Sequence, residues 1–235
     1  MTRTGTWLAA LVPSLVLGTC LVAGCSSLGE GGAPIALEFL VPQPAVVEID
    51  DTIQLRARVL DQAGDSIAAT IRWRTPDTTV AVDSISGNFW GILAGTGKVQ
   101  PTSGSLVGFL ASFLVRTRTD TIIVDSAAQS LLVVLATDTA SAPLGPMAAQ
   151  TSGTGLSGRA LIITLVAPTG GAVRLSGDVV ADTVTTGADG RPAVPIRVRK
   201  VGTTAGDSAI VQVESRRPSG AVVPGSGQKI RVFFQ

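Results

Sequence analysis

The sequence predicts an all-β protein, and three observations carry the prediction. The 235 residues include 27 Gly and 13 Pro, which supply turn formers along the whole chain. Apolar and polar residues alternate with a period of two, most clearly in residues 53–59, 71–74 and 196–199. Turn signals such as Gly64-Asp65 and Asp189-Gly190 separate the alternating runs. Short strands with this spacing predict antiparallel β-sandwiches, and no stretch after residue 34 offers an amphipathic helical stripe with caps.

Composition removes several classes of function. Only 15% of the residues are charged, and the chain contains no His and no Tyr. The absence of His excludes Ser-His-Asp and Cys-His catalysis and every His-ligated zinc site. A net charge of +1 gives no strong basic field for nucleic acid. We therefore expect no enzyme, no cofactor and no nucleic-acid partner.

The N-terminus has the pattern of an export signal. Arg3 is the only charge in the first 29 residues, and a short apolar stretch broken by Pro13 follows it. The segment Leu21-Val22-Ala23-Gly24-Cys25 resembles the bacterial lipoprotein signal, in which a Cys after small residues is lipidated and becomes the first residue. The resemblance implies a signal peptide at residues 1–24, a fatty acid such as palmitate on Cys25, and the membrane as a partner.

The segment that follows Cys25 predicts a tether. Half of residues 25–34 are Ser or Gly, and the nine residues 26–34 reach about 16 Å as a flexible coil. Removal of the signal also removes Arg3, which leaves 17 basic and 17 acidic residues. In the lipoproteins that the chain resembles, Ser26 rather than Asp at this place implies the outer membrane. Whether the protein faces the periplasm or the cell surface is left open.

The first predicted module spans residues 35–118. Its features follow in a fixed order: Asp51-Thr52 before an apolar strand, the Trp73–x–Thr–x–Asp step, Gly87–x–Phe89–x–Gly91, and Gly-Thr before the penultimate strand. This series resembles the second group of bacterial immunoglobulin-like domains and implies a β-sandwich. Trp73 is in phase with Ile71, so we expect it in the core. Residues 106–115 depart from the pattern, because they are apolar on both faces, and either the second module covers them or their register differs.

The second predicted module spans residues 119–235. A turn and strand at residues 185–196 resemble the invasin-type bacterial immunoglobulin-like repeat. Residues 131–135 and 161–166 are expected as strands buried on both faces, and residues 206–213 and 229–234 as the last two strands. Residues 144–157 are irregular and receive no assignment. The predicted fold class is therefore two immunoglobulin-like antiparallel β-sandwiches in tandem.

The candidate contacts for a ligand or partner are an outward aromatic residue and two arginine pairs. They are Trp90, Arg56, Arg58, Arg72 and Arg74. If Phe89 points inward, Trp90 points outward. There the indole either contacts a sugar or a partner protein, or it packs under a loop or against the second module. The arginine pairs either grip phosphate or carboxylate groups or keep a strand face soluble. Because the strands of Arg56 and Arg72 belong to opposite sheets, the two pairs are not expected to merge.

Carboxylates are the remaining acid–base candidates. Asp50-Asp51 precedes a strand, and Asp182 and Asp189 flank a turn. Paired carboxylates can hydrolyse a glycoside, and clustered ones can hold Ca²⁺. Neither spacing matches a dense calcium loop, and each Asp lies where turns favour it. We expect no catalytic and no metal-binding residues.

The sequence as a whole predicts a lipid-anchored protein of the cell envelope. Its expected role is non-catalytic binding, adhesion or spacing, with a protein or glycan of the envelope as partner. The alternative is a permanent accessory subunit of a larger envelope complex, docked through residues 106–115.

Overall fold

The computed structural model describes residues 32–124, 130–133, 140–201 and 208–234. Every regular element in these ranges is a β-strand. Among the described residues, no helix is long and apolar enough to cross a membrane. Cys25 and the predicted signal peptide lie outside the described residues, as do residues 25–31 of the predicted tether.

The first sandwich contains eleven strands in two layers. They are β1 (Ala36–Leu40), β2 (Val46–Glu48), β3 (Thr52–Gln54), β4 (Arg56–Leu60), β5 (Ser66–Ile67), β6 (Arg72–Arg74), β7 (Val80–Val82), β8 (Asn88–Gly91), β9 (Gly95–Ser103), β10 (Leu106–Val107) and β11 (Ala111–Arg116). One layer holds β1-β4-β5 and β3-β8-β7, which are joined because only Leu55 separates β3 from β4. The other holds β10-β9-β11-β2, with β6 on β9. This distribution of strands between two sheets is that of an immunoglobulin-like sandwich.

The alternating residues of this sandwich fill the space between the layers. Ile53, Leu55 and Val59 are buried, as their spacing predicts, and Trp73 is 6% exposed. The ring of Trp73 meets Phe39 edge-on, with centroids 5.1 Å apart. A second aromatic pair, Phe89 and Phe113, has centroids 4.7 Å apart and bridges β8 and β11. Trp73 is therefore a core residue, as expected.

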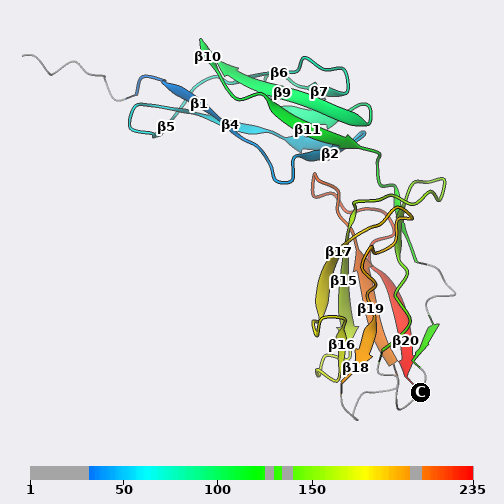
Figure 1. Ribbon diagram of the computed structural model, residues 1–235. Helices are drawn as coiled ribbons and strands as arrows, with labels where there is room; N and C mark the ends of the chain where they lie inside the picture. The colour runs from blue at the N-terminus through cyan, green and yellow to red at the C-terminus, as the bar shows by residue number, and fades with distance from the viewer. Residues whose placement is uncertain (1–31, 125–129, 134–139, 202–207, 235) are drawn as a thin grey trace, which may run out of the picture.

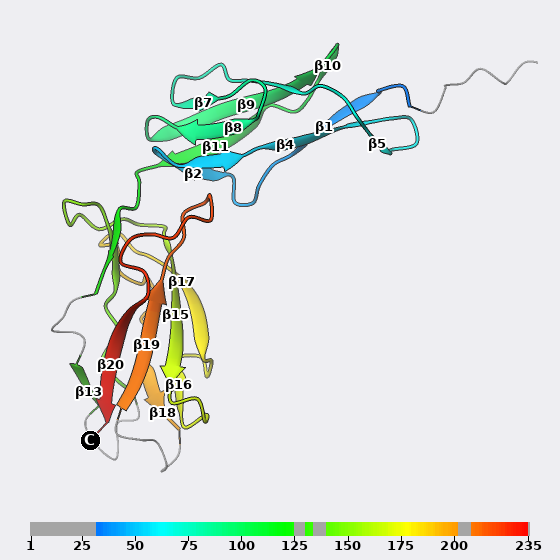
Figure 2. The same cartoon turned by 180° about the vertical axis from the view of Figure 1, so that it is seen from behind.

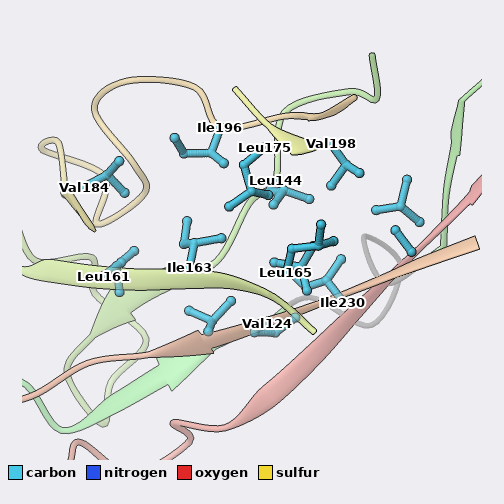
Figure 3. Close-up of a cluster of buried hydrophobic side chains, with 14 of the residues drawn as sticks. Val124, Leu144, Leu161, Ile163, Leu165, Leu175, Val184, Ile196, Val198 and Ile230 are labelled. Carbon is cyan, nitrogen blue, oxygen red and sulfur yellow. The ribbon is translucent and has the colours of Figure 1, made fainter. Parts of the chain in front are cut away.

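The second sandwich contains the remaining strands. They are β12 (Thr121–Ile123), β13 (Ser130–Val133), β14 (Met147–Ala149), β15 (Ala160–Ala167), β16 (Val173–Leu175), β17 (Ala181–Thr185), β18 (Val198–Lys200), β19 (Ser208–Glu214) and β20 (Gln228–Phe234). One layer is the five-stranded sheet β13-β20-β19-β15-β17. The other consists of the pairs β12-β14 and β16-β18. Figure 3 shows Leu161 of β15 near Val184 at one end of the interior, and Ile163 and Leu165 further along, where Leu144 and Leu175 lie across from β15.

Within the described residues, the two sandwiches share neither a sheet nor a core. All strand pairs join elements of the same sandwich, and each of the two buried clusters draws on one sandwich only. Figures 1 and 2 show the first sandwich lying across one end of the second, with β1 beginning at the end far from the junction. The predicted fold class, two immunoglobulin-like antiparallel sandwiches in tandem, is confirmed.

Of the two alternatives for residues 106–115, the structure supports a different register and contradicts coverage by the second sandwich. The segment forms two strands, β10 and β11, which both pair with β9 but in different registers. Gly108 still donates its N–H to the Pro101 carbonyl at 2.9 Å, whereas Ala111 is opposite Val99, so one extra residue lies between the two strands. The second sandwich does not cover the segment: Val107 is 59%, Phe109 70% and Leu114 43% exposed. The apolar residues on the outer face of this segment therefore remain accessible to solvent.

Other strand predictions need smaller corrections. Residues 161–166 are buried on one face only, since Leu161, Ile163 and Leu165 are buried whereas Val166 is exposed. The strand expected up to residue 196 begins only at Val198, because Pro192 and Pro195 have no N–H to donate to a ladder. Residues 144–157, left unassigned above, contain β14. Residues 131–135 fall partly in β13, whose side chains lie outside the described residues.

Candidate functional site at the junction of the sandwiches

The predicted arginine pairs lie on separate faces of the first sandwich. Arg56 and Arg58 are on β4, and Arg72 and Arg74 are on β6 in the opposite sheet, so the expectation that the pairs stay apart is confirmed. Arg58 pairs with Glu38 at 2.5 Å, and Arg74 donates to the Gln100 side chain at 2.6 Å. All four arginines are exposed. The structure brings none of them to a cleft.

Trp90 lies on the outer face of the sheet β3-β8-β7. Phe89 is fully buried, so its neighbour Trp90 points outward, as the alternation predicts. Its cross-strand partners are Thr52 on β3 and Ala81 on β7. The indole is half-buried.

The acidic candidates serve as turn and loop acceptors. Asp51 is buried and accepts hydrogen bonds from the backbone N–H and the hydroxyl of Ser219, at 3.2 and 2.7 Å. Asp182 and Asp189 each accept a backbone N–H within two residues. Within the described ranges, no group of three or more metal-binding side chains is arranged to hold an ion.

The most unusual side chain is one that the sequence reasoning missed, Glu48. It lies on β2, directly opposite Arg116 in the parallel ladder between β2 and β11, and is only 2% exposed. Both carboxylate oxygens are engaged. Thr119 donates its N–H to Oε2 at 2.9 Å and its hydroxyl to Oε1 at 2.7 Å. The carboxylate also forms ion pairs with Arg159 at 2.9 Å and Arg217 at 3.6 Å.

Arg159 is the main partner from the second sandwich. It is buried at the start of β15. Its Nε donates to the Thr119 hydroxyl at 2.8 Å, Nη1 to the Ser157 carbonyl at 2.8 Å, and Nη2 to the Thr117 carbonyl. Burial lowers the pKa of the Arg159 guanidinium, and the negative charge of Glu48 opposes this shift. Glu48, Thr119 and Arg159 thus form one buried polar network that crosses the junction.

Further contacts surround this network. Arg217, in the loop between β19 and β20, donates Nη2 to the Thr119 carbonyl at 2.8 Å. Arg116 donates Nη1 to the Gly158 carbonyl at 2.6 Å. Figure 1 shows the loop between β19 and β20 extending from the second sandwich toward β2. These contacts attach both the loop and the start of β15 to the first sandwich.

A cleft of about 660 Å³ opens beside the network. Its walls come from the loop between β1 and β2, from β3 and β8, and from the two segments of the second sandwich described above. The lining residues are Pro42, Gln43, Pro44, Val46, Glu48, Thr52, Ile53, Gln54, Asn88, Arg116, Gly158, Arg159, Ala160, Arg216, Arg217, Pro218 and Ser219. Because both sandwiches contribute, neither forms this cleft alone.

The sequence gives one indirect signal of this site. Glu48 interrupts the apolar run Val46-Val47-Glu48-Ile49, and all three residues of β2 are buried. A carboxylate in a buried run requires a cationic or hydrogen-bonding partner. The partners follow at residues 119, 159 and 217, in segments that pattern reasoning does not connect to β2.

Comparisons with known proteins give structural likeness only. No protein-family model matches the chain, and no curated protein matches it in sequence. Among solved structures it is similar to the Yersinia pseudotuberculosis adhesin InvE, at 16% identity and a TM-score of 0.39, over 85% of this chain and 58% of that one. It is similar to fibronectin(III)-like modules of Clostridium thermocellum CbhA, at 12% identity and a TM-score of 0.40, over 85% and 94%. Domains 4 and 5 of the S-layer protein SbsC match at 15% identity and a TM-score of 0.32, over 86% and 98%. The chain thus spans less than two thirds of the Yersinia adhesin structure, and the fold assignment rests on its own strand order.

Proposed function

We propose that this protein is a non-catalytic binding and spacer module of the bacterial cell envelope. The observation that supports it best is the junction. A buried ion pair between Glu48 and Arg159 joins the two sandwiches, each of which has its own core. Residues of both sandwiches line the cleft beside this ion pair. A partner protein or glycan of the envelope would occupy such a surface.

The proposed location rests on the sequence of the N-terminus. Residues 1–24 serve as the signal peptide, and Cys25 carries the fatty acid that holds the protein at the outer membrane. The tether of residues 25–34 then keeps the first sandwich close to the bilayer. Membrane attachment through the lipid and binding through the folded part are separate functions in this proposal.

Labelling with radioactive palmitate tests the anchor. Cells that express the full chain should incorporate the label, and Cys25→Ala should lose it. Cys20→Ala is the matched control, because Cys20 leaves with the signal peptide and its replacement should leave the labelling unchanged. Unchanged labelling in Cys25→Ala would remove the anchor from the proposal.

Crosslinking in intact cells tests the binding role. A crosslinker placed at the exposed Ser152, far from Cys25 in the sequence, should capture a neighbour of the second sandwich. Identification of an envelope protein or glycan in the adduct supports the proposal. The proposal is contradicted if only uncrosslinked protein is recovered under conditions in which the same crosslinker captures a known envelope contact.

The alternative is a permanent accessory subunit of an envelope complex. The observation that favours it is the exposed apolar row of Val107, Phe109 and Leu114 on the first sandwich. Pull-down of the tagged full chain at high salt should then recover one stoichiometric partner, and Phe109→Ser should release it. Recovery of nothing argues against this candidate. Arg56, Arg58, Arg72 and Arg74 stay candidate partner contacts in either case.

A further inference from the structure

The cleft at the junction carries an excess of positive charge. Its lining includes four arginines, Arg116, Arg159, Arg216 and Arg217, against one carboxylate, Glu48. Glu48 is paired with Arg159 and Arg217. Within the described part of the chain, Arg116 and Arg216 form no ion pair. The guanidinium groups of Arg116 and Arg216 therefore have no carboxylate partner among the described residues.

Several N–H groups of these arginines also have no acceptor. Among the described residues, the side chain of Arg116 donates only through Nη1 to Gly158, and that of Arg216 only through Nη1 to the Gly220 carbonyl at 3.2 Å. The buried Nε of Arg217 faces Glu48 Oε2 at 3.6 Å, so Arg217 is directed at the carboxylate, and the free N–H groups are those of Arg116 and Arg216. A guanidinium with free N–H groups presents the planar fork that binds a carboxylate or phosphate through two parallel hydrogen bonds.

The electrostatics of Arg159 agree with an anion in this cleft. Burial lowers the pKa of Arg159, Glu48 raises it, and the positive charge of Arg116 lowers it further. Arg116 and Arg159 thus repel each other across the lining. A negative group bound between them would reduce this repulsion.

The opposite wall is suited to hydroxyl groups. Thr52, Gln54 and Asn88 line it from β3 and β8. The Gln54 amide donates to the Leu55 and Ser86 carbonyls, so its carbonyl oxygen is left to accept from a ligand. The Asn88 amide makes no hydrogen bond to the described residues and offers both a donor and an acceptor.

Trp90 extends this wall with an aromatic surface. Asn88 and Trp90 alternate with the inward Phe89, so both point to the outer face of β8. Trp90 is also directly opposite Thr52 in the ladder between β3 and β8. Directly opposite residues have Cβ atoms about 4.5–5.5 Å apart, which places the half-buried indole beside the lining of the cleft.

We propose that the junction cleft binds a carboxylate-bearing saccharide. The free guanidinium groups of Arg116 and Arg216 bind the carboxylate. The side-chain amides of Gln54 and Asn88 form hydrogen bonds with ring hydroxyls, and the Trp90 indole packs on the apolar face of a sugar ring. The volume of about 660 Å³ lies within the roughly 300–1,000 Å³ of small-ligand sites and accommodates a short oligosaccharide. This inference rests on the binding role proposed above, but not on the lipid anchor.

Titration calorimetry with the full chain in detergent tests the ligand class. The probe is a tetrasaccharide of galacturonic acid, and the matched probe is the same tetrasaccharide after reduction of its carboxylates to alcohols. We expect the acidic probe to bind at least about tenfold more tightly than the reduced one, because charge-assisted contacts are lost. Its affinity should also fall as salt rises. Equal affinity for both probes, no binding, or tighter binding of tetraglutamate would overturn the inference.

Variants of the cleft locate the site. Arg216→Gln is the cleanest change, because Arg216 is exposed and its single hydrogen bond is local. We expect it and Arg116→Gln each to weaken the acidic probe by about tenfold. Trp90→Ala should weaken both probes by the same factor, since it removes stacking and no charge. Arg231→Gln, an exposed arginine on β20 outside the lining, is the control and should bind as the wild type does.

The outcomes separate this inference from the proposed function. Wild-type affinity in both Arg216→Gln and Arg116→Gln would mean that the saccharide binds elsewhere, and the inference fails. If no saccharide binds while crosslinking still captures an envelope protein, the inference fails and the proposed binding role stands.

Discussion

At the scale of single residues, Glu48 is the side chain on which the junction depends. Its partners Thr119, Arg159 and Arg217 all follow β11 in the chain, so the first sandwich supplies the carboxylate and the rest of the chain supplies the groups that neutralise it. Removing one member of a buried ion pair costs more than the pair contributes, because the remaining charge stays desolvated.

Glu48→Ala should therefore destabilise the full chain strongly. We expect a loss of about 3 kcal/mol in the free energy of unfolding, at the lower end of the range for broken buried pairs. Glu48→Gln, which keeps the Oε1 acceptor for Thr119, should lose less. Urea unfolding followed by tryptophan fluorescence measures both.

Glu38→Ala is the control for this prediction. Glu38 forms an ion pair with Arg58 in which both side chains are 43–48% exposed. Exposed pairs contribute about 0–1 kcal/mol, so this variant should unfold close to the wild type. If Glu48→Ala and Glu38→Ala lose the same free energy of unfolding, the buried ion pair at the junction does not stabilise the protein more than an exposed one.

At the scale of elements, the two glycines of the Gly–x–Phe–x–Gly motif allow β8 and the residue before it to lie close to their neighbours. Gly87 adopts φ of +73°, and a Cβ there would lie 2.6 Å from the indole nitrogen of Trp73. Gly91 has no such φ, but a Cβ there would lie 2.8 Å from the Glu48 carbonyl oxygen. The Gly–x–Phe–x–Gly spacing thus lets β8 pack against the core Trp at one end and against β2 at the other.

Gly91→Ala should destabilise the first sandwich and displace Glu48. The added methyl would lie 2.6 Å from the Val115 side chain as well as against the β2 backbone, and overpacking of this kind costs about 1–3 kcal/mol. The melting temperature measures the loss. Gly170→Ala is the matched control, because no atom lies within 4 Å of its Cβ position. If Gly91→Ala melts at or above the temperature of Gly170→Ala, the close approach of β8 to β2 is not a constraint.

The elements also show what the sequence can and cannot predict. Alternation correctly predicts the inward set Ile53, Leu55 and Val59, because only one face of that strand meets the core. It fails at residues 106–115, where the register against β9 shifts between Gly108 and Ala111, a change that apolar residues on both faces of the segment do not reveal. It also fails at Glu48, because β2 is buried at every position and shows no alternation. The cleft could not be predicted either: its arginines lie at the end of β11, just before β15 and in the loop between β19 and β20, and only the folded junction brings these segments together.

At the scale of the whole molecule, each sandwich has its own core and only the junction couples them. The buried cluster of the first sandwich draws on residues from Val47 to Val115, and that of the second on residues from Ile122 to Phe234. Leu114 is exposed in the full chain, so the second sandwich does not cover this part of β11. Because its buried cluster is separate, we expect the first sandwich to fold without the second.

A fragment of residues 34–118 should fold cooperatively, which far-UV circular dichroism and urea unfolding measure. The fragment lacks Thr119, Arg159 and Arg217, but Glu48 then lies at an open surface and is hydrated. Glu48→Ala should consequently change the stability of the fragment by less than about 1 kcal/mol, whereas it removes about 3 kcal/mol from the full chain. The difference between the two losses is the coupling free energy that the carboxylate provides across the junction. Aggregation of the fragment, or an equal loss in fragment and full chain, would mean that Glu48 stabilises the first sandwich from within and does not join it to the second.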